Sequence, residues 1–234
     1  MALLNVRRPT LSRRARKAAE FGTNLLAECS PPLQIMESKD RGKGLFATAD
    51  IGPGMVVTMY PAHAIVTGRQ PKMTKHDPHF SMAPENIMAY FLAITTAELG
   101  LVGDPKLCRI GAMAHMVNDA CPIGDVKRMR KRTPDMSDRD TMGLVVNYNV
   151  KVKRAVNCAF IIEPDCCYLE TVRHVAAGDE LLVAYGDAYW LDSEAQSATS
   201  IADAVTRALR ALPPLLAAQF HQMLSSSAIF ARSN

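Results

Sequence analysis

Short apolar runs bounded by turn-forming residues lie between residues 144 and 185 and limit what the chain can fold into. The runs are LVVNYNV (144–150), CAFIIE (158–163), CYLETVR (167–173) and LLVAY (181–185). Pro164-Asp165 and Gly178-Asp179 lie between them, at positions that suit tight turns. Similar strand-like pieces near 43–47 and 55–60 are punctuated by glycine and proline. The pattern argues against βαβ units and predicts a mostly β fold with short helices.

Other segments have a different character. From Pro84 to Gly100 apolar residues recur at helical spacing, with the proline suited to a first turn and the glycine to the end. We expect a loop over 61–83, and a short helical or turning segment over 107–117. After Trp190 the sequence becomes rich in alanine and leucine, which predicts two helices broken at Pro213-Pro214.

The 234 residues suit one generous domain with appendages, which we place at 31–190. Residues 1–30 then form a basic amino-terminal arm and residues 191–234 a helical carboxyl-terminal tail. Residues 1–19 carry six Lys or Arg and no acid, whereas the remainder holds 21 basic and 23 acidic side chains. Such an arm is compatible with a nuclear-import signal, a transit peptide, a nucleic-acid contact or a solvated tail.

Several classes of protein are disfavoured. No run of about eighteen apolar residues and no signal peptide are found, so no membrane partner is expected. The six cysteines form no C-x-x-C pair, which favours free thiols in a reducing compartment and no metal site. No G-x-S-x-G elbow, H-E-x-x-H pair or phosphate-binding G-x-x-x-x-G-K-[ST] occurs. The G-x-G in RGKGLFA, taken alone, is most simply a turn.

Four segments in order carry more information than any one of them. They are RGKGLFATADIGPGMVVTMY, AMAHMVNDAC, NCAF and GDELLVAYGDAYW. Together they resemble the SET-domain protein lysine methyltransferases over roughly residues 34–190. The first resembles the family's opening G-x-G, the second its R-F-[IV]-N-H-S-C segment, and the last its G-E-E-L-x-x-x-Y-G strand. The resemblance implies a SET-domain β-fold with knot-like carboxyl-terminal threading near 113–121 and 181–186.

The resemblance also implies a role for each matching residue. Tyr185 matches the catalytic tyrosine, and Tyr60 and Val183 match positions along the channel for the substrate lysine. The implied cofactor is S-adenosylmethionine, and no metal is implied. The residues implied to contact the cofactor are Lys43, Gly44, Leu45, Phe46, Asn118, Asp119, Tyr185 and Trp190. For Trp190, a core aromatic joining the tail to the domain is an equally good reading.

The sequence departs from the family pattern at several positions. Asp119 replaces the family histidine, which contacts the cofactor largely through its main chain, so the change is either tolerated or weakens cofactor binding through its charge. His115 replaces an arginine. Val183 stands where many members carry Phe or Tyr, which leaves the number of transferred methyl groups open. Residues 122–156 form a basic insertion, expected to expose Lys127–Arg132 on a loop that is either solvated or bound to nucleic acid or an acidic partner. The cysteine-rich zinc tail is absent, as in zinc-independent members.

The implied reaction is transfer of a methyl group from S-adenosylmethionine to a lysine amine. A free lysine has a pKa near about 10.4, so a narrow aromatic channel helps by favouring the neutral amine and aligning it. Histone tails are the first substrate candidate, with a nuclear location; a mitochondrial or cytoplasmic location is the alternative. Two further hypotheses stay open: a methyltransferase acting on a non-histone protein, and a non-catalytic SET-like interaction module.

Overall fold

The structure is a computed structural model that describes residues 32–67, 72–93, 99–130, 136–163, 166–191, 205–214, 217, 218 and 220. The predicted basic arm lies outside the described residues. The chain forms two compact units, each built from two stretches of sequence. The first unit comprises the residues up to Val117 and Asn157–Leu181, and the second comprises Asn118–Val156 and the residues from Leu182 onward.

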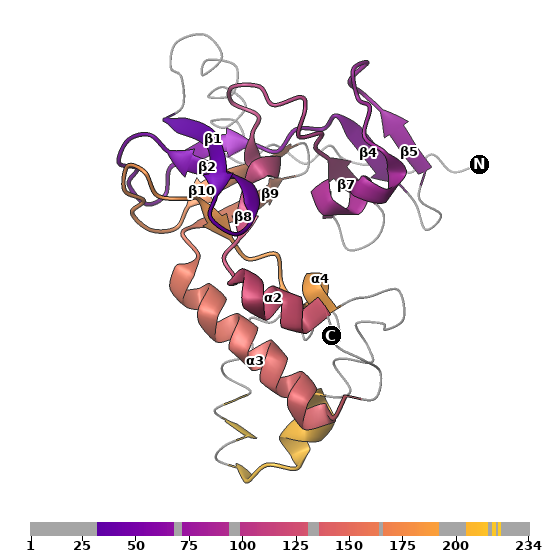
Figure 1. The fold of residues 1–234 in the computed structure, drawn as a ribbon, viewed down its shortest axis with the longest axis vertical. Helices are drawn as coiled ribbons and strands as arrows, with labels where there is room; N and C mark the ends of the chain where they lie inside the picture. The colour runs from indigo at the N-terminus through magenta and orange to yellow at the C-terminus, as the bar shows by residue number, and fades with distance from the viewer. Residues whose placement is uncertain are drawn as a thin grey trace, which may run out of the picture. The chain divides into compact units, whose positions relative to one another are not determined.

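The first unit is built from short antiparallel sheets (Figure 1). Its strands are β1 (Leu33–Ser38), β2 (Gly42–Ala47), β3 (Val56–Met59), β4 (Ala64–Thr67), β5 (Lys72–Lys75), β6 (Phe91–Ala93), β7 (Leu99–Val102), β9 (Cys158–Glu163) and β10 (Cys166–Thr171). Two 3₁₀ helices, η1 (Pro84–Tyr90) and η2 (Ala114–Met116), lie between them in sequence. The strand order is β1-β2 in one sheet, β3-β10-β9 in a second and β5-β4-β7-β6 in a third. The strands expected near 43–47, 55–60, 158–163 and 167–173 are therefore confirmed.

The β1–β2 hairpin places the G-x-G segment on a strand. Gly42 has φ +73°, a backbone conformation that favours glycine, and it starts β2 directly after the turn. The register pairs Leu33 with Ala47 and Met36 with Gly44. Leu45 is completely buried, so the hairpin is anchored through the side chain that follows the second glycine.

The helix predicted over 84–100 is wrong beyond Tyr90, because the chain turns there into β6 and returns as β7. Ala93 pairs with Gly100 in this sheet. A Cβ on Gly100 would lie 1.9 Å from Cε2 of Phe91, so the glycine permits a close approach of the ring and does not end a helix. The loop predicted over 61–83 is also wrong in part, since β4 and β5 pair antiparallel within it.

The second unit is mainly helical. Its elements are β8 (Asn118–Asp119), α2 (Ile123–Arg130), α3 (Asp138–Ala155), β11 (Leu182–Val183) and α4 (Asp187–Leu191). The predicted strand over 144–150 is wrong, because these residues lie inside α3. The exposed loop predicted for the basic cluster is also wrong for Lys127–Arg130, which lie in α2, while Lys131 and Arg132 fall outside the described residues. Residues 205–210 are helical, and most of the second predicted tail helix lies outside the described residues.

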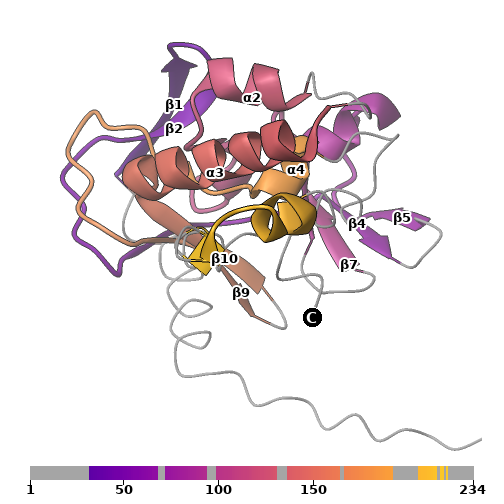
Figure 2. The same cartoon turned by 90° about the horizontal axis from the view of Figure 1, so that it is seen from below.

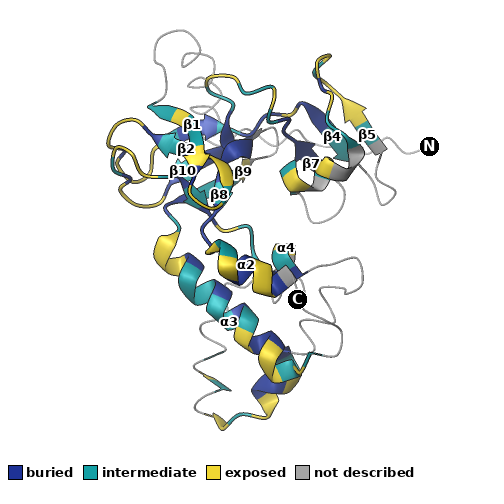
Figure 3. Cartoon of the chain, viewed as in Figure 1, coloured by how far each residue is buried: buried dark blue, intermediate teal, exposed yellow. Residues whose placement is uncertain are grey.

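Helix α3 forms because its cap and its apolar spacing agree. Ser137 is the N-cap, and its hydroxyl oxygen accepts a hydrogen bond from the Asp140 amide at 3.1 Å. The buried residues recur at helical spacing, at Thr141, Met142, Val145, Tyr148 and Val152. Figure 3 shows this buried stripe along one face of α3, and Figure 2 shows α3 beside α4. The core of the second unit thus holds a long helix where β structure was predicted.

The fold class is nevertheless confirmed as mostly strands with a few helices. The predicted threading of the chain stays a prediction. Among the residues that the structure describes, no helix has the length and apolar character needed to cross a membrane.

Gly103 is a second position where a side chain cannot fit. A Cβ there would lie 2.4 Å from the Cβ of His115, an atom too close to the backbone to move aside. Substitution of Gly103 by alanine is expected to lower the free energy of unfolding by about 2–3 kcal/mol through overpacking. Urea unfolding followed by circular dichroism would measure the change. Gly52→Ala is the control, because its Cβ would meet nothing within 4 Å, and equal midpoints for the two variants would contradict the prediction.

Candidate active site

In the first unit, the G-x-G residues form part of a tightly bonded strand. Gly44 and Leu45 are buried, and the Leu45 carbonyl accepts a hydrogen bond from the Leu181 amide at 2.7 Å. Phe46 forms a β-bridge with Glu180. The carbonyl of Leu45 is thus engaged in the protein's own structure, while Lys43 lies at the edge of a cavity.

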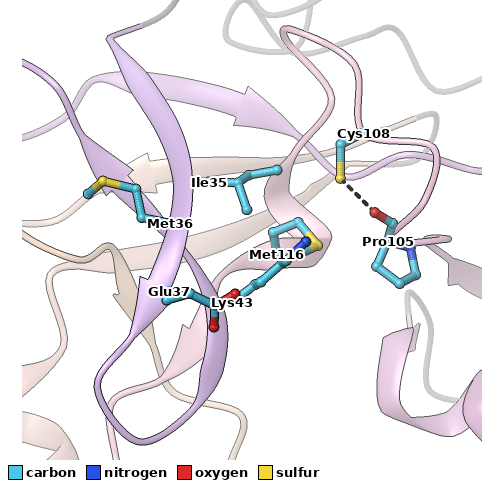
Figure 4. A pocket seen from close by; sticks show the side chains of 7 residues that line it. All are labelled: Ile35, Met36, Glu37, Lys43, Pro105, Cys108 and Met116. Carbon is cyan, nitrogen blue, oxygen red and sulfur yellow. Dashed lines mark hydrogen bonds between the residues drawn. The ribbon is translucent and has the colours of Figure 1, made fainter.

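That cavity has a volume of about 410 Å³, and all the residues that line it belong to the first unit (Figure 4). Its lining combines one cation, one carboxylate, three sulfur atoms and an apolar remainder. The lining residues are Ile35, Met36, Glu37, Lys43, Pro105, Cys108 and Met116. Burial raises the pKa of the Cys108 thiol, and the Lys43 ammonium partly offsets this effect. The thiol is therefore held neutral at the cavity wall.

His115 lies behind this wall and is nearly completely buried, with 5% of its surface exposed. Its Nε2 lies 3.5 Å from Sγ of Cys108, and its Nδ1 has no hydrogen-bond partner. Burial and the neighbouring His63 lower the pKa of His115 to about 4, although Asp104 acts in the opposite direction. The imidazole is therefore neutral at physiological pH.

His63 and Tyr60 are also held by specific contacts. The Asp104 amide donates to Nδ1 of His63 at 2.8 Å, which places the remaining ring proton of a neutral His63 on Nε2. The Tyr60 hydroxyl donates to the Tyr90 carbonyl at 2.7 Å, and its ring meets His115 edge-on. Tyr60 is buried, and its hydroxyl is already engaged in structure.

In the second unit, four donors converge on the carboxylate of Asp119. The Tyr148 hydroxyl donates at 2.7 Å, the Tyr185 amide at 2.7 Å and Nε1 of Trp190 at 3.2 Å, all to Oδ2. The Cys121 amide donates to Oδ1. Burial raises the pKa of Asp119, while the four hydrogen bonds act in the opposite direction. Burial and the Asp119 carboxylate together raise the pKa of Tyr148, so its hydroxyl remains protonated and can donate.

Helix α3 also reaches the residues after Tyr185. The Gly186 amide donates to the Tyr148 hydroxyl at 2.8 Å, and Nδ2 of Asn149 donates to Oδ2 of Asp187 at 2.8 Å. Gly186 has φ +97°, so a glycine is needed where the chain turns from Tyr185 into α4. Two adjacent helix residues thus bind two adjacent residues of this turn.

Three aromatic rings gather at the same place. The rings of Tyr185 and Trp190 are stacked, with centroids 5.8 Å apart and planes inclined by 12°. Tyr189 meets both edge-on, at 5.0 Å from Tyr185 and 4.7 Å from Trp190. Trp190 also packs against the buried core of the second unit, as the core-aromatic reading of this residue expected.

The predicted site residues fall into two groups. The first unit contains Lys43, Gly44, Leu45, Phe46 and Tyr60, and the second contains Asn118, Asp119, Val183, Tyr185 and Trp190. Strands β8 and β11 bring the second group together, pairing Asn118 with Leu182 and Asp119 with Val183 in parallel.

Sequence reasoning missed Tyr148 and Asn149, which bind the turn after β11. Two signals could have found the helix that carries them: the S-x-x-D cap formed by Ser137 and Asp140, and the helical spacing of the apolar residues after it. Nothing in the sequence alone pairs either residue with Asp119 or Asp187.

Thiols and metal ligands add little to this picture. Cys108, Cys121, Cys158 and Cys167 form no disulfide bonds. Within the described part of the chain, no group of three His, Cys, Asp or Glu side chains is placed to hold a metal ion.

Comparison with known proteins gives one family match. The family model described as the SET domain matches residues 42–186. No curated protein matches the sequence. Similar solved structures include the ATXR5 SET domain in complex with histone H3 dimethylated on R26, at 16% identity and TM-score 0.46, covering 75% of this chain and 68% of that one. ATXR5 in complex with a monomethylated histone is similar at 14% identity and TM-score 0.47, covering 75% and 67%. A candidate histone methyltransferase of Plasmodium falciparum is similar at 13% identity and TM-score 0.34, covering 68% of this chain and 96% of that one.

Proposed function

The chain belongs to the SET-domain family, and we propose that it is an S-adenosylmethionine-dependent protein-lysine methyltransferase. The observation that carries the proposal is the placement of Tyr185. This tyrosine lies two residues after β11, the strand within the family motif, and its amide is bound to Asp119, beside the motif residue Asn118. The family match spans both of these segments.

The proposal gives Tyr185 the catalytic role. Its ring is fixed by Tyr189 and Trp190, and its backbone is fixed by Asp119, so its hydroxyl is presented from a rigid base. A hydroxyl held in one position can orient an incoming lysine amine, and alignment is the largest contribution a protein can make to an in-line displacement. The methyl group passes directly from the cofactor sulfur to the lysine nitrogen, so no side chain of the protein has to form a covalent intermediate with it.

The cofactor assignment is also a proposal. S-adenosylmethionine would supply the methyl group on a positively charged sulfur. We assign contacts with it to Lys43, Gly44, Leu45, Phe46, Asn118, Asp119, Tyr185 and Trp190. The cavity beside Lys43 and Glu37 supports the assignment, because a cation and a carboxylate suit the two charged groups of an amino acid.

The substrate proposal is a lysine of a histone tail, with a nuclear location; mitochondrial and cytoplasmic locations are the alternatives. Tyr60 and Val183 are proposed to line the lysine channel. A basic peptide agrees with the family's chemistry, but fold does not determine substrate, so a non-histone protein is the second candidate. Lys127 and Arg128 are exposed on α2, which is compatible with the proposed nucleic-acid or acidic partner.

Substitution of Tyr185 by phenylalanine is expected to lower methyl transfer about a hundredfold, as removal of one preorganised hydroxyl typically does. The measurement is transfer of radiolabel from S-adenosylmethionine to core histones. Tyr168→Phe is the matched control, since this buried tyrosine lies in β10 and has no proposed role.

Calorimetry of cofactor binding completes the experiment. Label on a histone that only Tyr185→Phe loses would support the enzyme and its catalytic residue together. Cofactor binding without label on any histone would support the enzyme and reject the histone substrate. Neither binding nor label would leave the interaction module as the better reading.

A further inference from the structure

We propose that Tyr148 and Asn149 of helix α3, acting with Asp119, are positioning residues that clamp the backbone on both sides of Tyr185. The role rests on the proposed function of Tyr185, but the clamp itself is a statement about structure and can be tested without activity. It gives the inserted segment 136–156 a part in the site.

The first step is the donor count at Asp119. An ionised carboxylate only accepts hydrogen bonds, and all four of its partners are donors: the Tyr148 hydroxyl, the Cys121 and Tyr185 amides, and the Trp190 indole. Every partner therefore suits the ionised form. A neutral histidine has a single acceptor nitrogen and could not accept from all four donors, whereas an aspartate can.

The second step is the double role of the Tyr148 hydroxyl. It donates to Asp119 and accepts from the Gly186 amide at 2.8 Å. The amide of Tyr185 donates directly to Asp119. The amides of residues 185 and 186 are therefore both bound by the hydrogen-bonded pair of Asp119 and Tyr148. This arrangement restrains the two peptide planes that flank Tyr185, and with them the direction of its Cα–Cβ bond.

The third step is the rigidity of the helix. Tyr148 is 1% exposed and Val145 is completely buried, so α3 is anchored in the core of the second unit at this point. The adjacent Asn149 binds Asp187, the first residue of α4. Two consecutive residues of this buried helix thus hold Gly186 and Asp187 in place through hydrogen bonds.

The consequence concerns the geometry of the reaction. A misplacement of about 1 Å at a reacting group can cost on the order of a hundredfold in rate. Loss of one of several backbone restraints should shift Tyr185 less than this. The clamp therefore predicts a loss in kcat with little change in the affinity for either substrate.

The test compares Tyr148→Phe with Asn147→Ala on the full chain. Phenylalanine keeps the buried ring and removes only the bridging hydroxyl. Asn147 precedes Tyr148 on the same helix but bonds to Asp125, away from the clamp, so its substitution controls for damage to α3. We expect Tyr148→Phe to lower kcat about tenfold, with both KM values within about twofold.

Trp190 provides a second readout, because it is the single tryptophan of the chain and donates to the same carboxylate. Tyr148→Phe is expected to shift its emission, and Asn147→Ala to leave it unchanged. If Tyr148→Phe does not fold, Asn149→Ala removes the second restraint and is expected to lower kcat in the same manner.

The outcomes are separable. If Tyr148→Phe shifts the Trp190 emission but the wild-type protein transfers no methyl group, the clamp is supported and the proposed function is rejected. Wild-type kcat and wild-type emission in Tyr148→Phe would overturn the clamp while leaving the enzyme intact. A loss of kcat in Asn147→Ala equal to that in Tyr148→Phe would also overturn it, because the effect would then belong to the helix as a whole.

Discussion

Replacement of Asp119 by alanine is expected to lower the free energy of unfolding by about 3–5 kcal/mol, because it leaves four donors of the second unit without their acceptor. The cost is smaller than four separate losses, since burial of the carboxylate itself opposes folding and raises the pKa of Asp119. Urea unfolding followed through Trp190 emission measures the effect directly.

Asp125→Ala is the matched control for this experiment. Asp125 also accepts several hydrogen bonds in the second unit, but its partners Lys151 and Arg128 have side chains that are 41% and 75% exposed. Water can replace Asp125 at those partners, so a loss of about 1 kcal/mol or less is expected. A change below about 1 kcal/mol for Asp119→Ala would show that the four donors find other acceptors.

Acidification from pH 6.5 to pH 4 is expected to cost the protein about 2.5 kcal/mol of stability through His115 alone. The pKa of His115 is lowered from 6.5 to about 4 in the folded chain, chiefly by burial. Because its pKa is lower in the folded chain, His115 binds a proton more readily in the unfolded chain. Its contribution is therefore fully present above pH 6.5 and is lost as the pH falls toward 4.

His115→Gln isolates this effect, because glutamine carries no charge at any of these pH values. The difference in unfolding free energy between wild type and variant should shrink as the pH falls from 7 to 4.5, as measured by circular dichroism in urea. His63 also has a pKa lowered by burial, opposed by Asp77 and Asp104, so some pH dependence remains in the variant. A wild-type slope that His115→Gln retains in full would contradict the assignment.

The sequence predicts the sheets of the first unit well where turn residues bound each strand. Cys158–Glu163 and Cys166–Thr171 are examples, because tight turns and β-branched runs act locally. It fails at Phe91–Ala93, where helical spacing continues into a strand. There the pairing with Leu99–Val102 outweighs local periodicity, and Gly100 serves that pairing.

The candidate site shows the same division between local and distant information. Short motifs locate Asn118 and Tyr185 in the sequence, and the structure pairs Asn118 with Leu182, three residues before Tyr185. Whether Asp119 is tolerated was left open by the sequence, and its hydrogen bond from Tyr148 depends on a helix whose apolar residues, taken alone, predict a strand. A contact between residues 29 positions apart leaves no mark in either local pattern.

The division of each unit into two stretches of sequence has a consequence for synthesis on the ribosome. Two hydrogen-bond donors to the Asp119 carboxylate, at Tyr185 and Trp190, lie 66 and 71 positions further along the chain and are synthesised later. A nascent chain that has emerged only to Val156 holds an incomplete version of both units. At that stage β11 has not been made, so β8 has no strand to pair with and the Asp119 carboxylate lacks its hydrogen bonds from Tyr185 and Trp190. Folding of both units is therefore expected to be completed late and to depend on contacts between residues distant in sequence, which slows it. Until α4 has been made, the incomplete chain is expected to be a substrate for chaperones.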